Sequence, residues 1–401
     1  MTRNIIALIG LVLLAGCSGG GGDPSTTSSA PPPATPTAQP DMLTATNQGL
    51  LRGKANGQGQ QLIISRTNFR VATVSDGHVI YVRPKSEFDD DIWAVKLDGT
   101  GDRALVNTQE DEGIRDVKGP WLLYSNRNQQ IWSVRLDTGA QFLIHDNEGL
   151  GTTAQFYGTD RVMMGMDHEL FSNTVTGGNR LSYIFKRDGD TMLYVMHTTE
   201  HALIYGREVI GETNPETLKL FTVPLAGGAS TMLDDTQLRT HFGAAIGERI
   251  VYHRCTPAFA CDVVSIDSDG TDRVALTSHP AHEIVQGVTT DQVIIRRNLA
   301  GNDHLIAVPV TGGAERLLMT MTDSEFVDLI IGDLLIVRRS SGTWSLDLSG
   351  TLNQLDSRAG LDGFVAVGNA ICSTNPVWCM PFDGSGQAVK IADEGKVVGV
   401  L

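Results

Sequence analysis

Ile92-Trp93-Ala94-Val95-Lys96-Leu97-Asp98-Gly99 is the stretch that decides the fold, because variants of it recur along the chain. Each copy is a short apolar strand that runs into an Asp-rich or Gly-rich turn. One anchor residue marks each copy, at Trp93, Trp132, Phe171, Phe221, Val263, Ile306, Trp344 and Trp378. Successive anchors lie 39, 39, 50, 42, 43, 38 and 34 residues apart. The chain therefore repeats one structural unit of about 40 residues.

A repeat of this length is typical of a β-propeller, in which each repeat forms one four-stranded blade. In the first repeat we expect strands at residues 69–74, 78–83, 92–97 and 103–106, with the first of them innermost. The anchor residues should pack between neighbouring blades. The sequence thus predicts an all-β propeller of eight four-stranded blades, with seven blades as the alternative. We expect residues 60–66 to form an outer strand that joins the last blade, because an open ring would expose sheet edges.

The strand-and-turn pattern of residues 92–99 resembles the TolB-type, WD40-like propeller repeat of bacterial envelope proteins. It is also similar to the repeats of low-density-lipoprotein-receptor-type propellers. The resemblance covers about residues 69–390, and it implies a propeller fold and a place in the cell envelope. TolB-type proteins carry an N-terminal α/β domain before a six-bladed propeller, whereas this chain has a Gly/Ser/Pro-rich segment there and eight repeats.

Residues 1–16 have the features of a lipoprotein signal peptide, with Arg3 before the ten-residue apolar stretch 5–14. That stretch is too short to span a bilayer. It ends at Leu14-Ala15-Gly16-Cys17, so we predict that Cys17 is lipidated and that the chain is anchored to the membrane. An ordinary secretory signal that happens to contain a cysteine is the alternative. In a Gram-negative bacterium, Ser18 after the lipidated cysteine would favour the outer membrane.

Three segments follow from this reading: a signal peptide at 1–16, a lipidated tether at 17–45, and the propeller at 46–401. The tether is rich in Gly, Ser and Pro and has too few large apolar residues to form a core. The formal net charge of −15 argues against nucleic acid and favours a basic protein or peptide partner. The alternative is that the acidity only keeps an exported protein soluble.

Four cysteines remain after Cys17, and in an exported protein an even number indicates disulfides. Cys255 and Cys261 bracket the hairpin between the second and third strands of one repeat, and Cys372 and Cys379 bracket the same hairpin of another. We therefore predict two local disulfides. Metal binding by these cysteines is the alternative, but their spacings are too wide for a CxxC knuckle.

Acidic residues gather in the loops that should emerge together on one face of the ring. The candidate binding face contains Asp89, Asp90, Asp91, Glu110, Asp111, Glu112, His279, His282 and Glu283. This face is expected to attract a basic peptide, a cationic glycan or Ca²⁺. Ordinary loop polarity is the alternative explanation.

No catalytic motif accompanies this face. The sequence lacks a GxSxG elbow, a Walker loop and a dinucleotide fingerprint, and residues 279–283 do not have the HExxH order of a zinc protease. We therefore expect a monomeric, non-enzymatic scaffold with no metal or cofactor that binds an envelope protein or peptide. The alternative is a lyase or hydrolase that acts on polysaccharide or peptide at the channel mouth, with residues contributed by several blades.

Overall fold

The computed structural model describes residues 41–400 except 87–88, 147–152, 167–168, 186–189, 210–217, 235, 237, 257, 259, 300, 323, 359–360, 375 and 385. The predicted signal peptide, Cys17 and residues 18–40 of the predicted tether lie outside this part of the chain. Within it every regular element is a β-strand, and no helix could span a membrane. The first strand begins at Asp41, inside the range 17–45 assigned above to the tether.

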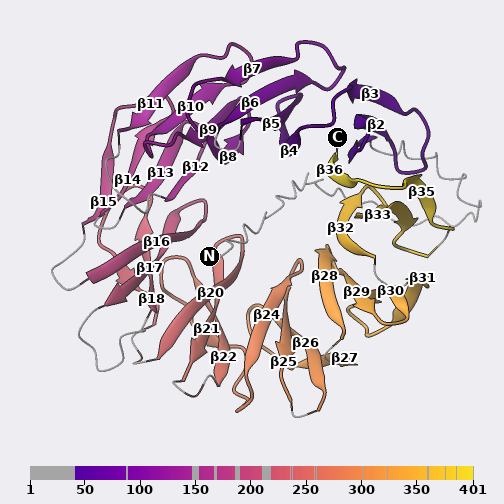
Figure 1. Ribbon diagram of the computed structural model, residues 1–401. Helices are drawn as coiled ribbons and strands as arrows, with labels where there is room; N and C mark the ends of the chain where they lie inside the picture. The colour runs from indigo at the N-terminus through magenta and orange to yellow at the C-terminus, as the bar shows by residue number, and fades with distance from the viewer. Residues whose placement is uncertain are drawn as a thin grey trace, which may run out of the picture. The chain divides into compact units, whose positions relative to one another are not determined.

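The strands form nine antiparallel four-stranded sheets, which follow one another around a ring (Figure 1). Blade 1 contains β4 (Arg70–Ser75), β5 (His78–Ser86), β6 (Asp89–Lys96) and β7 (Arg103–Val106). Blade 2 contains β8 (Gly113–Lys118), β9 (Trp121–Ser125), β10 (Ile131–Arg135) and β11 (Gln141–His145). Blade 3 contains β12 (Thr153–Tyr157), β13 (Arg161–Met166), β14 (Glu169–Thr174) and β15 (Leu181–Phe185). Blade 4 contains β16 (Asp190–Thr198), β17 (Ala202–Val209), β18 (Leu218–Pro224) and β19 (Thr231–Met232).

The remaining blades have the same order of strands from the inside outwards. Blade 5 contains β20 (Arg239–Ile246), β21 (Arg249–Cys255), β22 (Cys261–Asp267) and β23 (Val274–Ala275). Blade 6 contains β24 (Glu283–Val288), β25 (Gln292–Arg297), β26 (Asp303–Pro309) and β27 (Arg316–Met321). Blade 7 contains β28 (Phe326–Ile331), β29 (Leu334–Arg339), β30 (Gly342–Asp347) and β31 (Leu352–Asp356). Blade 8 contains β32 (Asp362–Val367), β33 (Ala370–Thr374), β34 (Val377–Pro381) and β35 (Val389–Ala392).

Blade 9 is built from both ends of the described chain. Its inner strand is β36 (Lys396–Val400), and its other strands are β1 (Asp41–Thr46), β2 (Gly49–Lys54) and β3 (Gln61–Ile64). β36 pairs antiparallel with β1, with Met42 opposite Val400. Because this pairing joins residues from opposite ends of the sequence, it closes the ring without an exposed sheet edge at the junction.

Blade 9 corrects two of the predictions from sequence. The eight-blade count was wrong, as was the seven-blade alternative, because strands β1 and β2 carry no copy of the anchor motif and so escape a search for the repeat. Residues 61–64 are an outer strand as predicted, but they do not join the last repeat. That repeat, residues 362–392, already has four strands of its own, so β3 belongs to the extra blade.

The hydrophobic core lies between successive blades. Ile80 and Ile92 of blade 1 pack with Leu122 of blade 2 in one buried cluster, and equivalent clusters recur around the ring. Two clusters enclose blade 9: Met42 packs against blade 8, and Leu43 packs against blade 1. Alternate residues of β1 thus face opposite neighbours, as the two-residue period of a strand requires. This burial on both sides favours the closed ring.

The anchor residues lie at these interfaces, as expected. Trp132 packs against the cluster between blades 1 and 2, and Trp378 packs against the cluster between blades 7 and 8. The predicted packing of the anchors between blades is incomplete, however, because the anchor tryptophans are only partly buried. A guanidinium group covers several of them: the centre of the Arg358 guanidinium lies 3.3 Å from the ring centroid of Trp378. Cation–π contact therefore completes what apolar packing leaves exposed.

Candidate functional site

Each blade exposes two kinds of connection on two opposite faces. Because the strands are antiparallel and consecutive, the hairpin from the second to the third strand emerges on the same face as the link to the next blade. We call this the connection face. The other face carries the turns from first to second strand and from third to fourth strand, and we call it the turn face. The acidic loops identified in the sequence belong to the connection face.

Six of the predicted residues lie in two segments of the connection face where blade 1 adjoins blade 2, and we call this group the acidic corner: Asp89, Asp90, Asp91, Glu110, Asp111 and Glu112. The first three begin strand β6, and the other three lie in the loop between β7 and β8. Lys85 Nζ lies 3.4 Å from Asp89 Oδ2 and 4.0 Å from Asp91 Oδ1. Arg70 Nη2 lies 3.4 Å from Asp90 Oδ2. Asp111 is exposed, and Asn128 donates to Glu110 across 2.8 Å.

Glu112 is the most buried member of the corner, with 3% of its surface exposed, followed by Asp91 with 6%. Thr108 Oγ1 donates to its Oε1, while Oε2 has no hydrogen-bond partner among the described residues. Burial raises the pKa of Glu112 to about 7; the Thr108 hydrogen bond opposes this rise, and the charges of Asp91, Asp89 and Asp111 add to it. Burial also raises the pKa of Asp91, against the effect of Lys85. Burial and the neighbouring carboxylates thus disfavour the ionised forms of Glu112 and Asp91.

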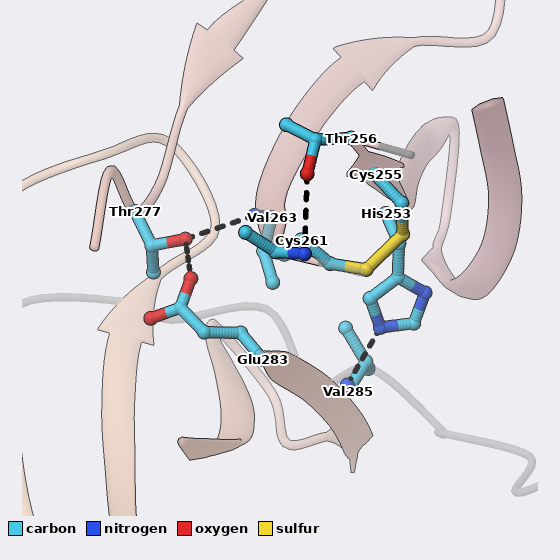
Figure 2. Close-up of a disulfide and its surroundings, with 9 residues drawn as sticks. His253, Cys255, Thr256, Cys261, Val263, Thr277, Glu283 and Val285 are labelled. Atoms are coloured by element: carbon cyan, nitrogen blue, oxygen red, sulfur yellow. Dashed lines mark hydrogen bonds between the residues drawn. A yellow bond between two sulfur atoms is a disulfide. The ribbon is translucent and has the colours of Figure 1, made fainter. Parts of the chain in front are cut away.

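The other three predicted residues lie elsewhere: His279 and His282 are in the loop between blades 5 and 6, and Glu283 begins strand β24. Glu283 is fully buried there: Arg297 Nε donates to its Oε1 across 2.6 Å, and Thr277 donates to its Oε2. Figure 2 shows Thr277 and Glu283 facing one another. The backbone amide of Ala281 donates to His279 Nδ1 across 3.1 Å. Glu283 is therefore a structural carboxylate, and it does not extend the acidic corner.

A recurring pair of residues explains the difference between Glu283 and Glu112. Glu283 is bonded to Arg297, and Glu325 is bonded to Arg339 across 2.5 Å; both arginines lie 14 residues after the glutamate. Each arginine ends the second strand of its blade, opposite the start of the first strand. The register of blade 2, with Gly113 opposite Ser125, places Asn126 at the equivalent position.

Asn126 does not take the place of the guanidinium beside Glu112, because its side chain forms hydrogen bonds within the β9–β10 turn. Its Nδ2 donates to Gln130 Oε1 across 2.8 Å, and its Oδ1 accepts from the Gln130 amide across 3.0 Å. Blade 2 thus keeps the buried glutamate of blades 6 and 7 without its arginine. The spacing of 14 residues between glutamate and arginine is a signal that the sequence analysis missed.

The structure also brings His241, His253 and His282 together at the junction of blades 5 and 6. His253 pairs in register with His241, and its Nε2 accepts a hydrogen bond from the Val285 amide across 2.8 Å (Figure 2). Burial, followed by the charges of His241 and His282, lowers the pKa of His253 to about 4. The imidazole is therefore neutral at physiological pH and acts as an acceptor that links two blades.

Both predicted disulfides are confirmed. Cys255 is bonded to Cys261 and Cys372 to Cys379, with Cα atoms 4.0 Å apart in each pair. Each bridge joins the second and third strands of its blade, where the two cysteines are direct register partners. Figure 2 shows the first bridge beside His253. These four cysteines therefore form structural cross-links on the connection face.

Comparison with known proteins supplies no family for the chain: no family model matches it, and no curated protein matches it. Among solved structures it is similar to a prolyl endopeptidase, with 10% identity and a TM-score of 0.49, over 76% of this chain and 54% of that one. The chain therefore spans about half the length of that peptidase. BamB from Moraxella catarrhalis matches with 13% identity and a TM-score of 0.45, over 76% of this chain and 90% of BamB.

TolB from Acinetobacter baumannii matches with 12% identity and a TM-score of 0.35, over 68% of this chain and 77% of TolB. At such identities none of these matches transfers a function. The predicted resemblance to TolB-type propellers is confirmed only at the level of the blade, a four-stranded antiparallel sheet repeated around a ring. Fold and site together define a nine-bladed β-propeller with an acidic corner on its connection face. The catalytic alternative stays a prediction.

Proposed function

We propose that this protein is a non-catalytic, lipid-anchored propeller of the bacterial cell envelope that binds a basic segment of another polypeptide at the acidic corner. The observation that carries the proposal is the buried Glu112, which lacks the arginine that neutralises Glu283 and Glu325 in other blades. A charged group is costly to bury without a partner, and here proton uptake near pH 7 takes the place of that partner.

A lysine or arginine from a partner would supply the missing cation. It would meet the exposed Asp111 and the half-buried Glu110 first, and it would favour the ionised form of Glu112 behind them. The net charge of −15 adds a long-range attraction for basic partners, which raises the rate of encounter. Specificity would come from the fixed geometry of the corner, because rigid strands hold it on both sides.

Anisotropy of a fluorescein-labelled nona-arginine peptide, titrated with the protein at low and high salt, tests this function. The corner variant is Glu110→Gln with Asp111→Asn, which removes two charges and leaves the buried Glu112 in place. The matched control is Asp76→Asn with Asp333→Asn, which removes two charges from exposed turns on the turn face. We expect the corner variant to weaken binding about tenfold, equivalent to about 1.4 kcal/mol.

Equal weakening in the two double variants would show attraction to net charge alone and would reject the acidic corner as the docking site. The same variants then serve in a crosslinking capture from the native envelope. A partner captured by the wild type and by the control, but lost by the corner variant, would support docking at this corner.

The membrane anchor is the second part of the proposal. Its support is the sequence Leu14-Ala15-Gly16-Cys17, followed by Ser18 and the Gly/Ser/Pro-rich tether. Acylation of Cys17 would hold a monomeric propeller at the membrane, at the outer membrane if the source is Gram-negative. This location would place the acidic corner among the proteins and peptides of the envelope.

A further inference from the structure

Three metal-ligating side chains converge on the turn face, opposite to the face that carries the acidic corner. Glu200 and His201 lie between β16 and β17 of blade 4, and Glu248 lies in the turn between β20 and β21 of blade 5. One ligand atom from each residue lies within 4.8 Å of the other two. We call these residues the turn-face triad. Because the triad spans two blades, no local sequence motif reveals it.

Neighbouring hydrogen bonds hold the triad in place. The Glu200 amide donates to Glu248 Oε1 across 2.8 Å, and Ser268 Oγ donates to Glu248 Oε2. The Ser268 amide also donates to the Glu248 carbonyl across 2.7 Å, while the Leu225 amide donates to the His201 carbonyl across 2.9 Å. The Thr199 side chain also hydrogen-bonds to Glu248. A carboxylate has about four lone-pair sites, so one site stays open beyond these three bonds. Outer contacts of this kind orient the ligands of protein metal sites.

We propose that Glu200, His201 and Glu248 bind one divalent transition-metal ion and that Zn²⁺ is the best match. An imidazole nitrogen beside two carboxylates favours Zn²⁺ over Ca²⁺ and Mg²⁺, which select sets of oxygen ligands. Three protein ligands leave the fourth tetrahedral position to water or to a group from another molecule. The ion would cross-link blades 4 and 5.

The geometry requires only a small closure around the ion. Tetrahedral ligands at about 2.0–2.1 Å from zinc lie roughly 3.4 Å apart. The side chains of Glu200 and His201 are exposed and Glu248 is half-buried, so rotation of the first two can close the separation between ligand atoms by the roughly 1.4 Å needed from the 4.8 Å limit. Glu248, held by Ser268, serves as the fixed ligand.

Calorimetric titration of the chelator-stripped full-length protein with ZnCl₂ tests the site. His201→Ala removes the nitrogen ligand, and His78→Ala is the matched control, because His78 lies beside the corresponding turn of blade 1. We expect one high-affinity ion in the wild type and in the His78→Ala protein. Loss of His201 should weaken that affinity by at least about 100-fold, since loss of an outer-shell partner alone costs 10–100-fold.

Two further measurements keep the result interpretable. The visible absorption of bound Co²⁺ reports a nitrogen–oxygen tetrahedral site and should vanish in the His201→Ala protein. Thermal unfolding in EDTA should be the same for variant and wild type, and only the wild type should gain stability with Zn²⁺. If His201→Ala fails to fold, the exposed Glu200→Gln replaces it. Unchanged Zn²⁺ affinity in the variants, no binding by the wild type, or equal affinity for Ca²⁺ would overturn the proposal.

Discussion

Single residues decide which part of the acidic sequence is structural and which part is available to a partner. Glu283 and Glu325 are buried beside arginines, so their charges are compensated within the fold. Glu112 occupies the equivalent position without an arginine, and its pKa rises to about 7 as a result of burial and neighbouring carboxylates. Glu112 and Glu283 are equivalent candidates in the sequence, because composition does not show which cation lies near each carboxylate.

Glu112→Gln tests the electrostatics of the corner. The pKa of Glu112 is raised in the folded state, so its contribution to the free energy of unfolding is full below about pH 4.5 and falls as pH rises through 7. Glutamine removes this loss. We therefore expect the difference in urea midpoint, variant minus wild type, to increase from pH 5 to pH 8. Glu110→Gln is the control, and parallel pH profiles for wild type and Glu112→Gln would contradict the prediction.

At the scale of single elements, the sequence predicts strands and local turns well but strand partners poorly. All four strands expected in the first repeat, residues 69–74, 78–83, 92–97 and 103–106, correspond to β4, β5, β6 and β7. Alternating apolar residues and an Asp-Gly turn specify such a hairpin locally; Asp76 and Gly77 have φ of 48° and 70°, as a type I′ turn requires. The partner of β36 has no such local signal.

Gly395→Ala tests the entry to the closing strand. Gly395 has a φ of +137°, and an added Cβ would lie 2.2 Å from the backbone oxygen of Ala45 in β1. The substitution therefore strains the pairing that closes the ring, and we expect it to cost about 2 kcal/mol or more of unfolding free energy. Gly247→Ala, at a positive φ with open space around the Cβ, is the control. The prediction fails if the two variants have the same thermal midpoint.

At the scale of the whole molecule, nine blades close because blade 9 is made from both ends of the described chain. Its strand β1 places Met42 in the cluster shared with blade 8 and Leu43 in the cluster shared with blade 1. The closed ring presents two faces. The connection face carries the acidic corner, and the turn face carries the turn-face triad.

Cys17→Ser tests the anchor of the whole protein. Each buried CH₂ of an acyl chain contributes about 0.8 kcal/mol to membrane affinity, so loss of the lipids should release the protein. We expect the variant to move from the membrane fraction to the soluble fraction and to lose incorporation of labelled palmitate. Ser18→Ala, which keeps the cysteine, should remain lipidated. A Cys17→Ser protein that still sediments with membranes would contradict lipid anchoring.

The sequence by itself determined the four-stranded repeat, the positions of most strands and the two disulfides, because these depend on residues close together in the chain. Only the tertiary structure decided the ninth blade, since Lys396–Val400 pairs with Asp41–Thr46 across the whole sequence. It also decided that Asn126, and no arginine, lies opposite the buried Glu112 and that His201 lies near Glu248. Such contacts arise from the packing of blade against blade, which brings together side chains that no local pattern relates.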